Sequence, residues 1–106
     1  MERITLERTG QRPLVFTGEL IKTESTRRHN SSRWTDMSIY RTAGGKYVAS
    51  MYHATCWQGE HDTCTAQVFA TIEDMCRWFT GETGSEYGAG GPALSALLKD
   101  FPEEVE

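Results

Sequence analysis

The stretch RWTDMSIYRTAGGKYVASMYHATCWQGEHDTCTAQVF, residues 33–69, decides the fold. Its first ten residues alternate, with Met37 and Ile39 on one face of an extended chain and Trp34 on the other. A period of two that is rich in aromatic and β-branched side chains is typical of a β-strand. We therefore expect a strand over residues 33–42.

Two further strands follow from the same stretch. Gly44 and Gly45 favour a tight hairpin turn, because glycine readily adopts the positive φ that such turns require. Residues 46–57 then alternate again, and a short polar turn leads into a third alternating run over residues 62–70. Three strands joined by short turns predict an antiparallel sheet with one face that must be covered.

The N-terminal part of the chain extends this sheet. Alternating residues predict strands over residues 2–9 and 13–24. Pro13 cannot donate a backbone hydrogen bond, so it belongs at a strand start or at a sheet edge. Gly18 in the middle of the second strand suggests a bulge or a bend.

After residue 70 the apolar period changes from two to 3.6, which predicts helices over residues 72–80 and 92–101. Thr71 and Asp74 resemble a capping box at the start of the first helix. The glycine-rich residues 81–91 read as a flexible linker. The apolar stripes of the two helices are Ile72, Met75, Cys76 and Phe79, and Leu94, Leu97, Leu98 and Phe101.

The expected fold class is α+β in a single domain of residues 1–106. It comprises a curled antiparallel β-meander of about five strands with two C-terminal helices packed on one face. Docking the helices on the sheet buries apolar side chains from both layers. Neither layer is expected to be stable alone.

The composition points to a globular chain, with 38% hydrophobic and 25% charged residues. No apolar run approaches the roughly 20 residues that span a bilayer, and the N-terminus has no signal-peptide pattern. Three cysteines, an odd number, fit reduced thiols better than disulfides. These features predict a cytoplasmic protein with no membrane association.

The net charge of −4 is unevenly distributed. Up to His53 the chain holds nine Lys and Arg against five Asp and Glu, and from Ala54 onward it holds two against ten. Such a division of charge between the two halves of the chain fits a basic binding face, an acidic binding face or association between copies. A homodimer is therefore one of the alternatives. An unevenly charged solvated surface is the plainer interpretation.

The basic loop before the third strand is the strongest binding candidate. Arg27, Arg28, His29, Arg33 and Trp34 lie within it. Arginines can pair with phosphates while an indole stacks on a base, which predicts an anion or nucleic-acid site. Arginine also binds carboxylates, so an acidic protein surface is an equal target, and the overall pI of about 5.4 argues against nucleic acid. A solvated loop without a ligand is the third alternative.

Aromatic side chains are a second binding candidate. If the helices cover only one face of the sheet, an open aromatic face would bind protein. The alternative is a sheet that curls into a half-barrel and buries these side chains. The residues concerned are Trp34, Tyr40, Tyr47, Tyr52 and Trp57.

One spacing in the chain resembles a set of metal ligands, and it is formed by His53, Cys56, His61 and Cys64. Zinc accepts histidine and cysteine ligands. However, residues three apart on a strand lie on opposite faces, so the first pair would not converge. We expect buried thiols and turn histidines, with no metal and no cofactor. A Cys–His nucleophile also lacks supporting elements, so no catalytic residue is assigned.

The hairpin YRTAGGKYV, residues 40–48, followed by TIED at residues 71–74, resembles the strand–turn–strand and helix-start pattern of small bacterial proteins called the EXLDI family. The resemblance covers about a third of the chain, and the terminal motif that names the family is absent. It implies no catalytic residues. By composition, the chain is also similar to small acidic proteins of phages and plasmids, which include anti-CRISPR inhibitors.

The function expected from the sequence is a non-catalytic protein-binding module, an accessory or inhibitor of a host system carried by a mobile element. Anion or nucleic-acid binding through the Arg27–Trp34 loop is the alternative. A metal site at the His53–Cys64 cluster is the weakest hypothesis.

Overall fold

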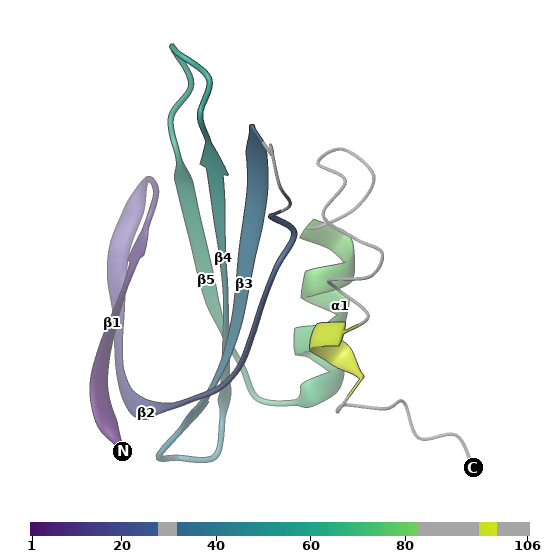
Figure 1. Ribbon diagram of the computed structural model, residues 1–106. Helices are drawn as coiled ribbons and strands as arrows, with labels where there is room; N and C mark the ends of the chain where they lie inside the picture. Colours follow the sequence, from purple (N-terminus) through teal and green to yellow (C-terminus); the bar gives the residue numbers. More distant parts are fainter. Residues whose placement is uncertain (28–31, 83–95, 100–106) are drawn as a thin grey trace.

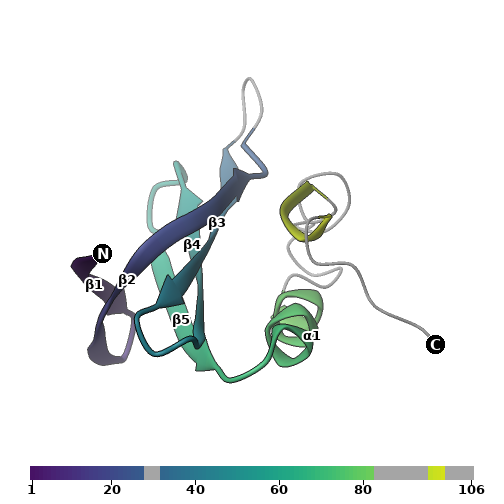
Figure 2. The ribbon, with the colours of Figure 1, turned by 90° about the horizontal axis from the view of Figure 1, so that it is seen from below.

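The computed structural model describes residues 1–27, 32–82 and 96–99, and it places a five-stranded antiparallel sheet against a helix (Figure 1). The strands lie in the sheet in the order in which they occur in the chain. Viewed along the sheet, α1 lies entirely on one side of it (Figure 2). The elements are β1 (Glu2–Arg8), β2 (Gln11–Ser25), β3 (Arg33–Thr42), β4 (Tyr47–Thr55), β5 (Thr63–Phe69) and α1 (Ile72–Glu82).

The alternating side chains of β3 and β4 determine which residues of these strands form the core. Met37 pairs with Met51 and Ile39 pairs with Ala49 across the two strands, so all four side chains share one face. These side chains are buried. The helix covers this face and contributes its own apolar stripe. The core cluster comprises Met37, Ile39, Ala49, Met51, Phe69, Met75, Phe79 and Leu97.

Helix α1 begins where the sequence predicts. The Thr71 hydroxyl accepts a hydrogen bond of 3.2 Å from the backbone N–H of Asp74, which caps the first turn. Asp74 itself forms an ion pair with Arg77 at 3.5 Å rather than completing a capping box. Met75 and Phe79 are fully buried. The ring of Trp78 lies 5.7 Å from that of Phe69 and so connects α1 to β5.

The sheet curls because β2 bends. Its first half pairs with β1 and its second half pairs with β3, with a register shift between Leu20 and Lys22. We expected a bulge or a bend at Gly18, where the pairing of β2 passes from β1 to β3, and the register shift falls just after it. Gly18 serves a different purpose: a Cβ at this position would lie 2.4 Å from the backbone oxygen of Arg41. The residue allows the backbone of β2 to approach β3 closely.

A contact between the two ends of the sheet completes the curl. The backbone N–H of Thr9, in the β1–β2 turn, donates to the carbonyl oxygen of Cys64 at 2.9 Å. The N–H of Cys64 donates to the Thr9 hydroxyl at 2.8 Å. The meander is therefore a half-barrel, and the expected curl is confirmed.

The C-terminal prediction is confirmed in part. Helix α1 continues through Gly81 to Glu82, so the expected linker begins later than residue 81. Most of the expected linker and of the second helix, residues 83–95 and 100–101, lies outside the described residues. Within the second helix, residues 96–98 are helical and Leu97 is fully buried. Among the described helical residues, none forms a helix that is long and apolar enough to cross a membrane.

Candidate binding surface at the end of the sheet

The start of β3, the end of β4 and the β4–β5 connection meet at one end of the sheet. Arg33 pairs with Thr55 in the ladder, and the β4–β5 connection projects beyond the neighbouring strands (Figure 1). Two arginine–tryptophan pairs lie at this end, Arg27 with Trp34 and Arg33 with Trp57, and because Arg33 and Trp34 are neighbours on β3 the two pairs lie on opposite faces of the sheet. We call these four side chains, together with Glu60, the Arg–Trp tip. Its members are Arg27, Arg33, Trp34, Trp57 and Glu60.

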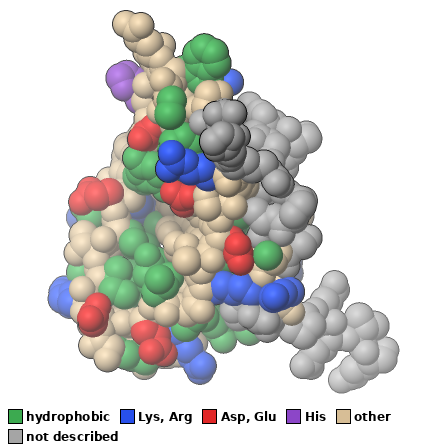
Figure 3. Space-filling view, in the orientation of Figure 1, with side chains coloured by type: hydrophobic (Ala, Val, Ile, Leu, Met, Phe, Trp, Pro, Cys, Tyr) green, Lys and Arg blue, Asp and Glu red, His purple; other side chains and the backbone are tan. Residues whose placement is uncertain are grey.

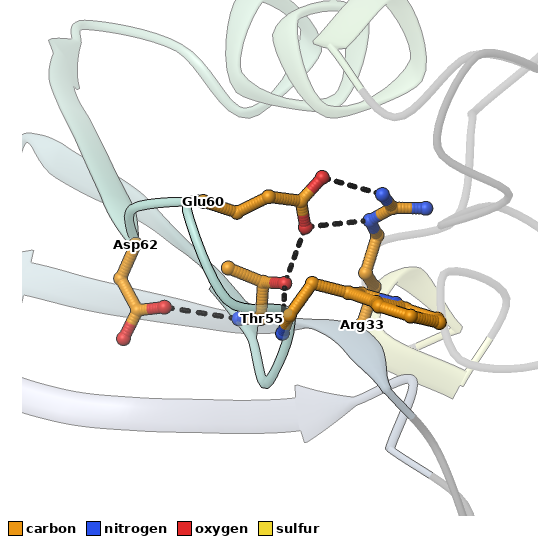
Figure 4. Close-up of polar contacts among 5 residues, drawn as sticks. Arg33, Thr55, Glu60 and Asp62 are labelled. Atoms are coloured by element: carbon orange, nitrogen blue, oxygen red, sulfur yellow. Dashed lines mark hydrogen bonds and ion pairs between the residues drawn. The ribbon is translucent and has the colours of Figure 1, made fainter.

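Glu60 is the polar centre of the tip (Figure 4). Its carboxylate accepts a hydrogen bond of 3.0 Å from Arg33 Nε and a second from Arg33 Nη2, so the guanidinium binds in bidentate fashion. The Thr55 hydroxyl donates to the same carboxylate at 2.5 Å. These hydrogen bonds, first from Arg33 and then from Thr55, lower the pKa of Glu60 to about 2. Glu60 is therefore ionised at physiological pH, and it raises the pKa of Arg33 in return.

Asp62 fixes the end of the β4–β5 connection that leads into β5. Its carboxylate accepts hydrogen bonds from the Tyr52 hydroxyl at 2.5 Å and from the Thr55 backbone N–H at 2.9 Å. The bond from Tyr52, followed by the bond from the backbone, lowers the pKa of Asp62. The same contact raises the pKa of Tyr52. Asp62 and Glu60 together fix the shape of a connection that is otherwise solvent-exposed.

Each tryptophan of the tip lies beside an arginine. The Arg27 guanidinium is 4.4 Å from the centre of the Trp34 ring, and that of Arg33 is 5.9 Å from the Trp57 ring. Both distances allow cation–π attraction. Trp57 is nevertheless 56% exposed, and the Arg33 side chain is 63% exposed. The tip thus presents an indole to solvent beside an arginine that is already held in place.

An open cavity of about 620 Å³ adjoins the tip. Its lining combines Arg33, Glu60 and His61 with His53 from β4 and Thr35 from β3. The Thr35 hydroxyl lies 2.9 Å from His53 Nδ1. The cavity is large enough for a side chain of a partner, and its walls expose polar and apolar surface about equally.

The described histidines and cysteines do not gather into a metal-like group. Tyr52 pairs with Cys64 across β4 and β5, so Cys64 and His53 lie on opposite faces of the sheet. Across residues 1–27, 32–82 and 96–99, no group of three or more metal-binding side chains converges. Burial, then the charges of Asp62 and Glu7, raises the pKa of the Cys64 thiol. A raised pKa disfavours the thiolate that a nucleophile requires.

The predicted binding residues separate into three groups. Arg27 contacts Trp34 and Arg33 contacts Trp57 at the tip, whereas Arg28 and His29 lie outside the described residues. Tyr40 contacts Phe16 edge-on at 5.5 Å, and Tyr47 packs against the core. Those two tyrosines therefore do not join the tip.

Sequence reasoning missed Glu60, Thr55 and Asp62. Arg33 and Glu60 are 27 residues apart in the chain, and no local pattern relates them. The signal that could have found the pair is the strand register, which places the start of β3 beside the end of β4.

Three comparisons with known proteins complete the description of this surface. No family model matches the chain. No curated protein and no solved structure matches it either.

Proposed function

We propose that the chain is a non-catalytic protein-binding module that contacts its partner through the Arg–Trp tip. The observation that carries this proposal is the exposed Trp57 beside Arg33, whose guanidinium is fixed by Glu60. Tryptophan and arginine are the side chains that most often dominate binding energy at protein interfaces. Fixing them before binding reduces the entropy lost when the complex forms.

The charge of the tip favours protein over nucleic acid. Arg33 is paired with Glu60, and Asp62 adds a second ionised carboxylate nearby. A phosphate approaching this surface would meet two carboxylates for the two arginines at positions 27 and 33. Nucleic-acid sites usually carry an excess of positive charge. A protein surface that offers an apolar pocket for Trp57 and a hydrogen-bond acceptor beside Arg33 fits the tip better.

The test is capture from a bacterial lysate by the immobilised chain, compared with Trp57→Ala. Leu20→Ala is the matched control, because Leu20 is also a large exposed apolar side chain, at 52%, but lies on β2 away from the tip. We expect a specific partner to be retained by the wild-type chain and by Leu20→Ala and to be lost with Trp57→Ala. Equal retention by all three proteins would contradict the proposal.

A salt titration tests the alternative of nucleic-acid binding. Single-stranded oligonucleotides should show no affinity that falls steeply as salt rises, because few phosphates can be neutralised here. A steep salt dependence that is lost in Arg27→Gln would favour the nucleic-acid alternative. The role of an inhibitor or accessory carried by a mobile element stays a prediction until the partner is known.

A further inference from the structure

Strand β5 is an edge strand that lacks the usual protection against pairing. Among the described strands, β4 alone pairs with it in the ladder, and the β1–β2 turn bonds to its residue Cys64 through Thr9. Natural edge strands are commonly blunted by charged residues or proline. Strand β1 at the other edge carries Glu2, Arg3, Glu7 and Arg8, whereas β5, with the sequence TCTAQVF, has neither a charge nor a proline.

The register identifies which backbone groups of β5 are open. Both the N–H and the C=O of Cys64 bond to Thr9, so they point away from β4. In an antiparallel pair these directions alternate with every residue. The register between β4 and β5 has no shift, so Ala66 and Val68 also point their backbone groups away from β4. Among the described residues, none forms a hydrogen bond with those groups.

A groove runs beside this edge. Its volume is about 370 Å³, and its walls are Arg8, Thr9 and Gln11 of the β1–β2 hairpin on one side and Trp78 of α1 on the other. Cys64–Gln67 of β5 form the floor. Thr65 in that floor carries a buried hydroxyl without a hydrogen-bond partner among the described residues.

Apolar side chains accompany the open edge. Figure 3 shows hydrophobic side chains gathered between β1 and β5 on the face in view. Val68 is 40% exposed and lies on the face of the sheet opposite α1, which it shares with Val48. An extended segment that paired with β5 could place alternate side chains against Val68 while its backbone bonded to the edge.

The geometry points to strand addition: an extended peptide segment of a partner protein pairs with the backbone of Ala66 and Val68 along β5. Thr9, Gln11 and Gln67 of the groove are uncharged and can bond to a peptide backbone, and the cation in the lining, Arg8, already donates from Nε to the carbonyl oxygen of Arg12 at 2.9 Å. A second copy of the chain fits less well. Its β1–β2 hairpin and its α1 would have to fit past the hairpin and helix that flank β5 in the first copy. This site is separate from the Arg–Trp tip and goes beyond the function proposed above.

The test uses a display library of random heptapeptides selected on the immobilised full chain. Val68→Pro removes a backbone N–H that points away from β4, so the ladder with β4 keeps its hydrogen bonds. Val68→Thr keeps the N–H and a similar shape, and it is the matched control. We expect selected peptides to bind Val68→Thr as they bind wild type, and to bind Val68→Pro about tenfold more weakly or worse.

Amide exchange provides a second readout on the wild-type chain. The amides of Ala66 and Val68 should exchange rapidly in the free protein and become protected when a selected peptide is added. If circular dichroism shows that Val68→Pro does not fold, Val68→Lys replaces it, since a charge at an edge also blocks pairing. Trp57→Ala should leave peptide binding unchanged, which separates this site from the tip.

Three results would overturn the inference. The first is a peptide selection in which no binder distinguishes Val68→Pro from Val68→Thr. The second is strong protection of the Ala66 and Val68 amides in the free monomer. The third is a dimer in solution that Val68→Pro dissociates, because the edge would then serve a second copy of the chain.

Discussion

The face of the sheet under α1 and the Arg–Trp tip are held together by different interactions. Under α1, side chains from β3, β4, β5 and the helix exclude water, and Met37, Ile39, Met75 and Phe79 have no exposed surface. At the tip, exposed side chains are fixed by ion pairs and hydrogen bonds around Glu60.

This difference predicts that the core under α1 determines stability, while recognition by the tip is our proposal. Burial of large apolar side chains stabilises a fold by roughly 1.5–3 kcal/mol for each side chain. An exposed ion pair typically contributes only about 0–1 kcal/mol, because water screens both charges. The Arg33–Glu60 pair therefore shapes the tip more than it stabilises the protein. Substitutions in the two regions should separate these effects.

The largest effect is expected from Phe79→Ala. Phe79 is fully buried at the centre of the core, and its removal leaves a cavity under the helix. We expect the free energy of unfolding to fall by about 3–5 kcal/mol. Trp57→Ala, also an aromatic truncation, should change it by no more than about 0.5 kcal/mol. Urea unfolding of the two variants tests the contrast, and similar losses in both would break it.

Gly18→Ala should have the next largest effect. The added Cβ would lie 2.4 Å from the backbone oxygen of Arg41, so β2 and β3 would have to move apart. We expect a loss of about 1–3 kcal/mol, similar to other cases of overpacking. Gly44→Ala is the control, because its Cβ would have no neighbour closer than 3.9 Å. An equal effect of both substitutions on the urea midpoint would show that the close approach at Gly18 is unimportant.

The smallest effect concerns the pH dependence of the tip. The pKa of Glu60 falls from 4.5 to about 2 in the folded chain, so the pair with Arg33 favours the fold above pH 4.5 and loses that influence as pH falls toward 2. NMR titration of the Glu60 carboxyl should give a midpoint near 2. Arg33→Gln should move that midpoint toward 4.5. A midpoint that does not respond to Arg33→Gln would show that the ion pair does not form in solution.

The sequence predicts the parts of this fold that local patterns control. Alternation places Met37 and Ile39 on one face of β3, and the 3.6-residue period places Met75 and Phe79 on one face of α1. The hairpin turn also follows, since Gly45 has a φ of 84°. In each case the physical cause lies within a few neighbouring residues.

Contacts between distant residues are not predictable in this way. The bend of β2 between Leu20 and Lys22 depends on pairing with both β1 and β3. The bonds between Thr9 and Cys64 form only once the sheet has curled. For the same reason the sequence predicts Arg33 as a group available to anions, whereas the fold pairs it with Glu60.

Amide hydrogen exchange across the whole chain tests most directly whether the core under α1, and not the tip, determines the stability of the fold. The amides of β3, β4 and α1 around Met37, Met51 and Phe79 should exchange only through global unfolding, and those of residues 57–62 through local opening. Trp57→Ala should leave the slow set unchanged. Equal protection of residues 57–62, or faster exchange throughout the core in Trp57→Ala, would contradict this account.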